Sequence, residues 1–237
     1  MYRHLNAGHI VQTIGLLRER IEARFPGSGL GKVATELHQI ANESVARSTW
    51  IARPHFGLRL GIGFLVLLIV AVGVMALVNL QLPFRLHSFP ELVQAIESGV
   101  NDLVFIAFAV FFLVTIEVRI KRRRALKAIH ELRSIAHIID MHQLTKDPHV
   151  MLNPGTVTQS SPKRALTTFE LCRYLDYCSE MLSLIGKLAA LYGERFDDPV
   201  ALNAVDQIED LTTGLSRKIW QKIALVNQEQ EAKPVPD

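Results

Sequence analysis

The sequence predicts an all-α membrane protein, with a two-helix transmembrane hairpin and a cytoplasmic helical bundle built from N- and C-terminal amphipathic helices. Three observations lead to this fold class. Residues 60–81 carry no charge, residues 103–116 form a second apolar stretch, and the flanking segments repeat apolar residues at helical spacing. No segment of any length shows the alternation of apolar and polar residues that is typical of a β-strand.

Residues 1–55 are expected to form a cytoplasmic segment of two amphipathic helices. A Phe-Pro-Gly-Ser-Gly run at residues 25–29 ends the first helix and turns the chain. Each helix carries one apolar stripe, at Ile10, Ile14, Leu17 and Ile21 in the first and at Val33, Leu37 and Ile40 in the second.

Residues 58–81 are predicted to be the first transmembrane helix, because about 20 apolar residues in a helix cross the roughly 30 Å hydrocarbon core. Residues 102–118 are predicted to be the second. Its apolar run is shorter and also suits a buried helix of a soluble protein. Four phenylalanines and the lack of internal charge favour a span. Glu117, at its end, is expected to reach the lipid headgroups.

A basic cluster follows the second apolar stretch, at Arg119, Lys121, Arg122, Arg123, Arg124 and Lys127. Basic residues accumulate on the cytoplasmic side of membrane spans. We therefore expect both termini in the cytoplasm, residues 82–101 as a short external loop, and a location in a bacterial inner (plasma) membrane. The cluster either serves topology alone or also binds anionic lipid headgroups. It accounts for most of the net charge of +3, so no nucleic-acid partner is expected.

Beyond the second span, the helix is expected to continue through a juxtamembrane part, residues 119–145. Its apolar stripe contains Ala128, Leu132, Ile135 and Ile139. Residues 146–163, rich in Pro, Gly and Ser, are interpreted as a linker, and residues 230–237 as a disordered tail.

Residues 164–229 are predicted to form a helical hairpin. Thr167 and Glu170 match a capping box, and Asp198 followed by Pro199 marks the start of the second helix. The first helix carries a heptad seam typical of coiled-coil packing, at Leu171, Leu175, Cys178, Leu182, Ile185, Ala189 and Tyr192.

The best candidate for a functional surface is the polar face of the juxtamembrane helix, at His130, Arg133, Ser134, His137, Asp140, Met141 and His142. His130 and His137 are about 10 Å apart along a helix, so one metal ion cannot bridge them. Only His137 with Asp140 has workable ligand spacing. Three interpretations stay open: a solvated face, an interaction or pH-sensing face, and a metal site completed by other residues.

The sequence contains no P-loop, GxGxxG, GxSxG or CxxC motif, so no catalytic residue and no cofactor are predicted. The leading hypothesis is a membrane-anchored, non-enzymatic interaction, scaffold or signalling-type protein that acts through its cytoplasmic bundle as a homo-oligomer. Self-association is the expected contact, and a further protein partner is left open. The first alternative is a homo-oligomeric two-span pore or membrane effector. The second is a metal-dependent enzyme that uses the face around His137 and Asp140.

Overall fold

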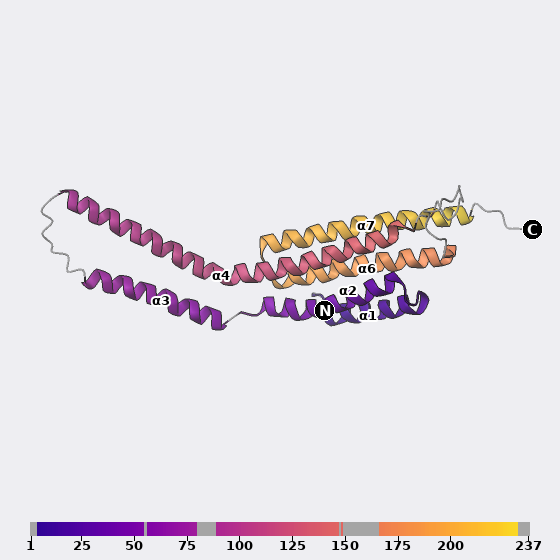
Figure 1. Cartoon of the computed structure of the whole chain (residues 1–237), viewed down its shortest axis with the longest axis horizontal. Helices are drawn as coiled ribbons and strands as arrows, with labels where there is room; N and C mark the ends of the chain where they lie inside the picture. The colour runs from indigo at the N-terminus through magenta and orange to yellow at the C-terminus, as the bar shows by residue number, and fades with distance from the viewer. Residues whose placement is uncertain (1–3, 55, 80–88, 147, 149–165, 232–237) are drawn as a thin grey trace, which may run out of the picture. The chain divides into compact units, whose positions relative to one another are not determined.

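The computed structural model describes residues 4–54, 56–79, 89–146, 148 and 166–231. Within these residues the chain is all helical, as predicted, with no strand (Figure 1). Most of the predicted linker and tail, and residues 82–88 of the predicted loop, lie outside the described residues. The six helices are α1 (Ala7–Arg24), α2 (Gly29–Ala52), α3 (Phe56–Asn79), α4 (Phe89–Leu144), α6 (Thr168–Arg195) and α7 (Pro199–Glu231).

The helices divide into two compact units. The bundle unit comprises Met1–Ala52 and Arg124–Asp237, and the apolar unit comprises Arg53–Arg123. Helix α4 contributes residues to both. Each unit is described by itself below.

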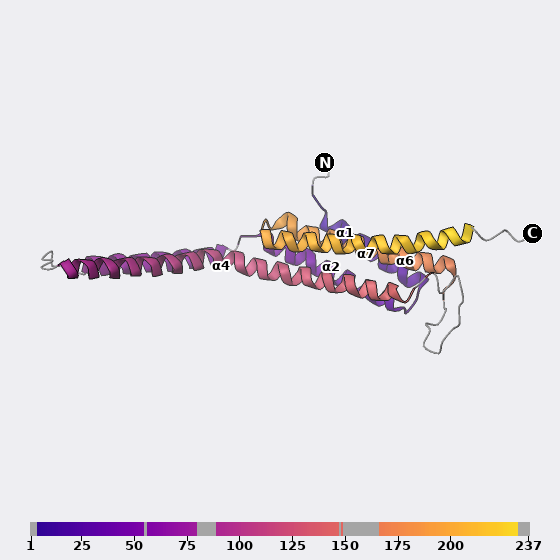
Figure 2. The ribbon, with the colours of Figure 1, turned by 90° about the horizontal axis from the view of Figure 1, so that it is seen from above.

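Helix α6 lies at the centre of the bundle unit, and the predicted heptad seam explains why. Figures 1 and 2 agree that α1, α2, α7 and the C-terminal part of α4 run alongside α6. Every residue of the seam is fully buried: Leu171, Leu175, Cys178, Leu182, Ile185, Ala189 and Tyr192. Because the core surrounds α6, the seam packs several helices rather than one, and the predicted coiled-coil geometry stays a prediction.

The predicted stripes of the other bundle helices point into the same core. Ile14, Leu17 and Ile21 of α1 are buried, and so are Val33 and Leu37 of α2. Ile40 is partly buried and packs against the core. Helix α4 contributes Ala128, Leu132, Ile135 and Ile139, all buried.

Local signals set the helix ends. Gly27 adopts a φ of 67° in the turn after α1, a left-handed conformation that glycine adopts without steric cost. The capping box before α6 is present, with the Glu170 amide donating to Thr167 Oγ1 at 3.2 Å. At the start of α7, Asp198 Oδ1 accepts hydrogen bonds from the amides of Val200 and Ala201, at 3.2 and 3.0 Å.

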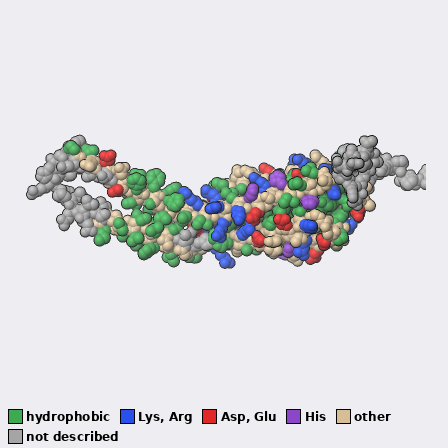
Figure 3. All heavy atoms as spheres, in the orientation of Figure 1, with side chains coloured by type: hydrophobic (Ala, Val, Ile, Leu, Met, Phe, Trp, Pro, Cys, Tyr) green, Lys and Arg blue, Asp and Glu red, His purple; other side chains and the backbone are tan. Residues whose placement is uncertain are grey.

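The apolar unit consists of α3 and the N-terminal part of α4. Among the described residues, one helix is long and apolar enough to cross a membrane, over Gly99–Leu144 of α4. Helix α3 contains a shorter apolar stretch, Arg59–Met75. Hydrophobic side chains crowd the surface of this unit (Figure 3). The predicted hairpin that crosses a bilayer twice therefore stays a prediction, while one candidate span is found.

Helix α4 begins earlier than expected, at Phe89 rather than residue 102. The sequence argument placed residues 82–101 in a short external loop. Pro90 lies in the first turn of α4, where a missing N–H costs no hydrogen bond. Gly99 lies inside the helix and does not end it. The weak breaking signals in this segment are overridden by the apolar sequence that follows.

Candidate functional site

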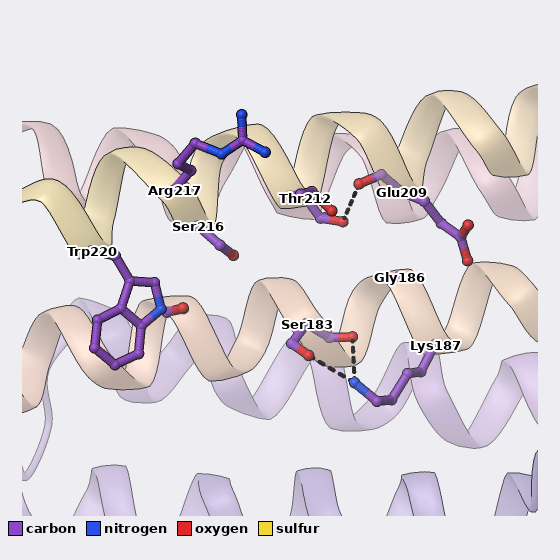
Figure 4. Close-up of a pocket in the computed structure, with 10 residues that line it drawn as sticks. Ser183, Gly186, Lys187, Glu209, Thr212, Ser216, Arg217 and Trp220 are labelled. Atoms are coloured by element: carbon purple, nitrogen blue, oxygen red, sulfur yellow. Dashed lines mark hydrogen bonds between the residues drawn. The ribbon is translucent and has the colours of Figure 1, made fainter.

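A groove with a volume of about 630 Å³ lies on the outer side of the α6–α7 hairpin (Figure 4). We call it the α6–α7 groove. It is lined by Ser179, Ser183, Gly186 and Lys187 of α6 and by Glu209, Thr212, Thr213, Ser216, Arg217 and Trp220 of α7. The lining residues of α6 flank its buried seam, since Ser179 and Gly186 each directly follow a seam residue.

The polar groups of the groove are held by their own helices. Lys187 Nζ donates to Ser183 Oγ at 2.7 Å, and Thr212 Oγ1 donates to the Glu209 carbonyl at 3.2 Å (Figure 4). No histidine or cysteine lines the groove.

The shape of the groove favours docking of a helix. At Gly186, an added Cβ would lie 3.3 Å from Thr212 Oγ1, so the glycine permits the close contact between α6 and α7. Small residues let a further helix backbone approach closely. Trp220 lies at one end of the groove (Figure 4), and 58% of its surface is exposed. Exposed tryptophan is uncommon on a free surface and common at the centre of protein interfaces.

The predicted polar face of α4 is only partly a single surface. His130, Ser134, His137 and Met141 are exposed, as the helical spacing predicted. Ser134 Oγ donates to the carbonyl of His130 at 3.1 Å, within its own helix. These four side chains therefore form an exposed strip.

The other three predicted residues contact neighbours. Arg133 donates to Gln207 Oε1 of α7 at 2.7 Å, and Asp140 accepts a hydrogen bond from Gln143 Nε2 at 2.7 Å. His142 Nδ1 lies 3.5 Å from the Tyr174 hydroxyl of α6. No group of three or more potential ligands that could hold a metal occurs within the described residues, so His137 and Asp140 gain no further ligand there.

The structure divides the basic cluster between the units. Lys121 pairs with Glu117 at 2.9 Å and donates to the Arg53 carbonyl, and Arg119 lies over the Phe112 ring. Arg122 and Arg123 also belong to the apolar unit, whereas Arg124 and Lys127 belong to the bundle unit.

Glu117 is buried and ion-paired within the apolar unit, and its expected position at the lipid headgroups stays a prediction. Its second partner is Arg59 of α3, at 2.7 Å.

Two polar contacts inside the bundle unit were not foreseen from the sequence. Buried Gln143 accepts from Lys222 of α7 through its side-chain and backbone oxygens, at 2.6 and 3.1 Å. Arg47 of α2 pairs with Glu131 of α4, a hydrogen bond that raises the pKa of the guanidinium. For the contact between Gln143 and Lys222, the sequence did contain a signal, namely a glutamine within an otherwise apolar stripe. The second has no local signal because its members lie far apart in the chain.

Comparison with protein-family models, with curated proteins and with solved structures finds no match to this chain.

Proposed function

We propose that this chain is a membrane-anchored, non-enzymatic interaction protein that self-associates through the α6–α7 groove. The observation that carries the proposal is the charge order along the exposed face of α7 beside the groove. Asp206, Glu209 and Asp210 precede Thr213, and Arg217 and Lys218 follow it. An antiparallel α7 helix from a second copy places the acidic segment of each copy beside the basic segment of the other.

The register of such a pair follows from the spacing. If the twofold axis passes near Thr213, Glu209 of each copy faces Arg217 of the other. Both side chains are exposed, and neither forms an ion pair within the described residues. Their separation along one helix is about 12 Å, so they cannot neutralise each other within a copy. A twofold contact uses the same surface on both copies, as most homodimers do.

Between Glu209 and Arg217, the surface of α7 near the proposed twofold axis carries little steric bulk. Gly214, next to Thr213, has no atom within 4 Å of an added Cβ, so it faces open space. Trp220 then supplies apolar contact area on each side of the axis. A second copy is therefore the occupant whose charges and shape fit best.

Anchoring is supported by the apolar unit. Its exposed large side chains include Leu60, Phe64 and Leu67 of α3 and Phe105, Phe108 and Phe111 of α4. Contiguous exposed apolar surface of this extent is unusual in soluble monomers and is typical of a lipid contact. We propose that α3 and residues 102–118 of α4 cross the bacterial inner membrane, with both termini in the cytoplasm, as the basic cluster suggests.

A charge swap tests the self-association. Glu209→Arg and Arg217→Glu each place like charges opposite one another twice per dimer, and we expect about a 10-fold weaker dimer or worse for each. The double variant restores opposite charges and should regain most of the affinity. Dimer fraction is measured by mass photometry of the full chain in detergent over a dilution series.

The matched control is Glu36→Arg, the same chemical change at an exposed position of α2. It should leave the dimer unchanged. A monomer at every concentration, or a double variant no better than either single one, would contradict the proposal.

The alternatives make different predictions in the same preparation. A pore predicts ion flux across liposomes that contain the protein, and an interaction protein predicts none. A metal enzyme that uses His137 predicts stoichiometric metal in the purified protein and its loss in His137→Ala.

A further inference from the structure

A second pocket of the bundle unit lies between α2 and α4, with a volume of about 400 Å³. We call it the α2–α4 pocket. It is lined by Ala46, Arg47, Trp50, Ile51, Arg124 and Lys127. Part of the lining is apolar, at Ala46, Trp50 and Ile51, and three cations complete it. This combination of an apolar wall and cations differs from the mixed charges of the α6–α7 groove.

The three cations differ in whether an acidic side chain already pairs with them. Arg47 is already paired with Glu43 and Glu131, so its charge is compensated. Arg124 and Lys127 form no ion pair with any described residue. The pocket therefore offers two uncompensated positive charges, on one helix and three residues apart, which is the spacing of neighbours on one helix face.

Arg124 lies over the Trp50 ring. Its guanidinium carbon lies 3.9 Å from the centre of the Trp50 ring. Stacking uses the face of the guanidinium and leaves the N–H groups at its edge free to donate. Guanidinium edges bind phosphate oxygens through two parallel hydrogen bonds. Lys127 adds a point charge beside it.

We propose that the α2–α4 pocket binds the phosphate headgroup of an anionic phospholipid, with the glycerol and upper acyl carbons against Trp50 and Ile51. This inference rests on the proposed membrane anchoring. The apolar wall favours a lipid over free phosphate, because inorganic phosphate makes no use of it. In the sequence, Arg124 follows the apolar stretch of α4 after eight residues, a position expected near the cytoplasmic headgroups.

The test uses quenching of Trp50 fluorescence by phosphatidylglycerol with brominated acyl chains. The chain has two tryptophans, so Trp220→Phe leaves Trp50 as the reporter. The full chain in neutral detergent is titrated with brominated phosphatidylglycerol and, separately, with brominated phosphatidylcholine. We expect quenching at roughly 30-fold lower concentration for the anionic lipid, because each basic residue near an anionic headgroup contributes about a fivefold preference.

Two double variants distinguish binding in the α2–α4 pocket from electrostatic attraction to the basic cluster as a whole. Arg124→Gln/Lys127→Gln should abolish the preference, whereas Arg119→Gln/Arg123→Gln removes the same charge outside the pocket and should keep it within about threefold. Equal losses in both variants would show attraction to the basic cluster as a whole and overturn the pocket.

A competition arm distinguishes the phosphate sources. Inorganic phosphate or glycerophosphate at 10 mM, about the range of weak anion binding, should not relieve the quenching. Relief would show a site for soluble phosphate and overturn the lipid assignment. Extraction of cell membranes with alkaline carbonate reports the anchoring separately, so a failure of the proposed function is distinguished from a failure of the pocket.

Discussion

The replacement Leu132→Ala tests whether α4 closes the core of the bundle unit. Leu132 is fully buried on the face of α4 that carries Ile135 and Ile139. Truncation of a buried leucine to alanine costs about 2–5 kcal/mol, because transfer energy is lost and a cavity stays behind. With about 3 kcal/mol as the central value, the population of the opened bundle rises roughly 100-fold, since each 1.4 kcal/mol is a factor of ten.

The thiol of Cys178 reports this opening. Cys178 is fully buried in the seam of α6, and burial raises its pKa to about 12. The thiolate is the reactive form, so Cys178 reacts with an alkylating reagent only after the bundle opens. In a Cys172→Ser background, with the full chain in detergent, we expect Leu132→Ala to speed the alkylation of Cys178 roughly 100-fold when reclosing is faster than labelling.

Ser134→Ala is the matched control. It lies two residues further along α4, on the exposed face, and should leave the rate within about twofold, as surface changes usually do. If the alkylation rate of Cys178 in Leu132→Ala also stays within about threefold of the parent rate, Cys178 is exposed by an opening that does not involve α4. The argument that α4 belongs to this core would then be refuted.

Three further predictions concern the pKa of a thiol, a helix cap and a buried charge. The pKa of Cys178 is raised from 9.0 to about 12 by burial, so its contribution to stability is fully present below about pH 9 and is lost as the pH rises towards 12. Thermal unfolding followed by circular dichroism at pH 7, 9 and 10.5 should show a smaller alkaline loss of stability in Cys178→Ala than in the parent. Asp198→Ala removes the acceptor of two amide hydrogen bonds at the start of α7 and should lower the free energy of unfolding by about 1 kcal/mol. Asp198→Asn keeps an acceptor and should lose less stability. Equal losses in the two variants would argue against the helix cap. Glu117→Gln leaves the buried Lys121 without its carboxylate partner and should lower the unfolding temperature in detergent. Adding Lys121→Met should restore the unfolding temperature. No recovery would show that loss of the Glu117–Lys121 pair does not cause the destabilisation.

Features encoded by neighbouring residues were predictable from the sequence. The burial of the α6 seam follows from apolar residues that repeat every three or four positions, since such a stripe must be covered. The start of α7 follows from Asp198 and Pro199, because both act on the first turn alone. The exposure of His130 and His137 follows from their position opposite the stripe that contains Leu132.

Features that depend on which helices meet were not predictable in the same way. The contact of Gln143 with Lys222 joins residues 79 positions apart, and no local pattern indicates that their helices are neighbours. The pairing of Glu117 with Arg59 depends in the same way on α3 lying beside α4 within the apolar unit. The sequence argument therefore named no partner for Glu117 and treated the basic cluster as one surface.

The α6–α7 groove was missed for a related reason. The sequence analysis assigned no role to its residues, because neither helix taken alone marks them out. The groove exists because small residues such as Ser183 and Gly186 on α6 lie opposite Thr212 and Ser216 on α7. Only the pairing of the two helices turns two polar faces into one concave surface.

Disulfide crosslinking at Thr213 tests the proposed self-association most directly. Thr213 is exposed and lies next to the proposed twofold axis, so Thr213→Cys, in a Cys172→Ser/Cys178→Ala background, should form a crosslinked dimer under mild oxidation in native membranes. Ser134→Cys, exposed on α4 and away from the groove, should stay monomeric under the same conditions. A Thr213→Cys protein that stays monomeric, or that crosslinks no better than Ser134→Cys, would contradict assembly through the α6–α7 groove.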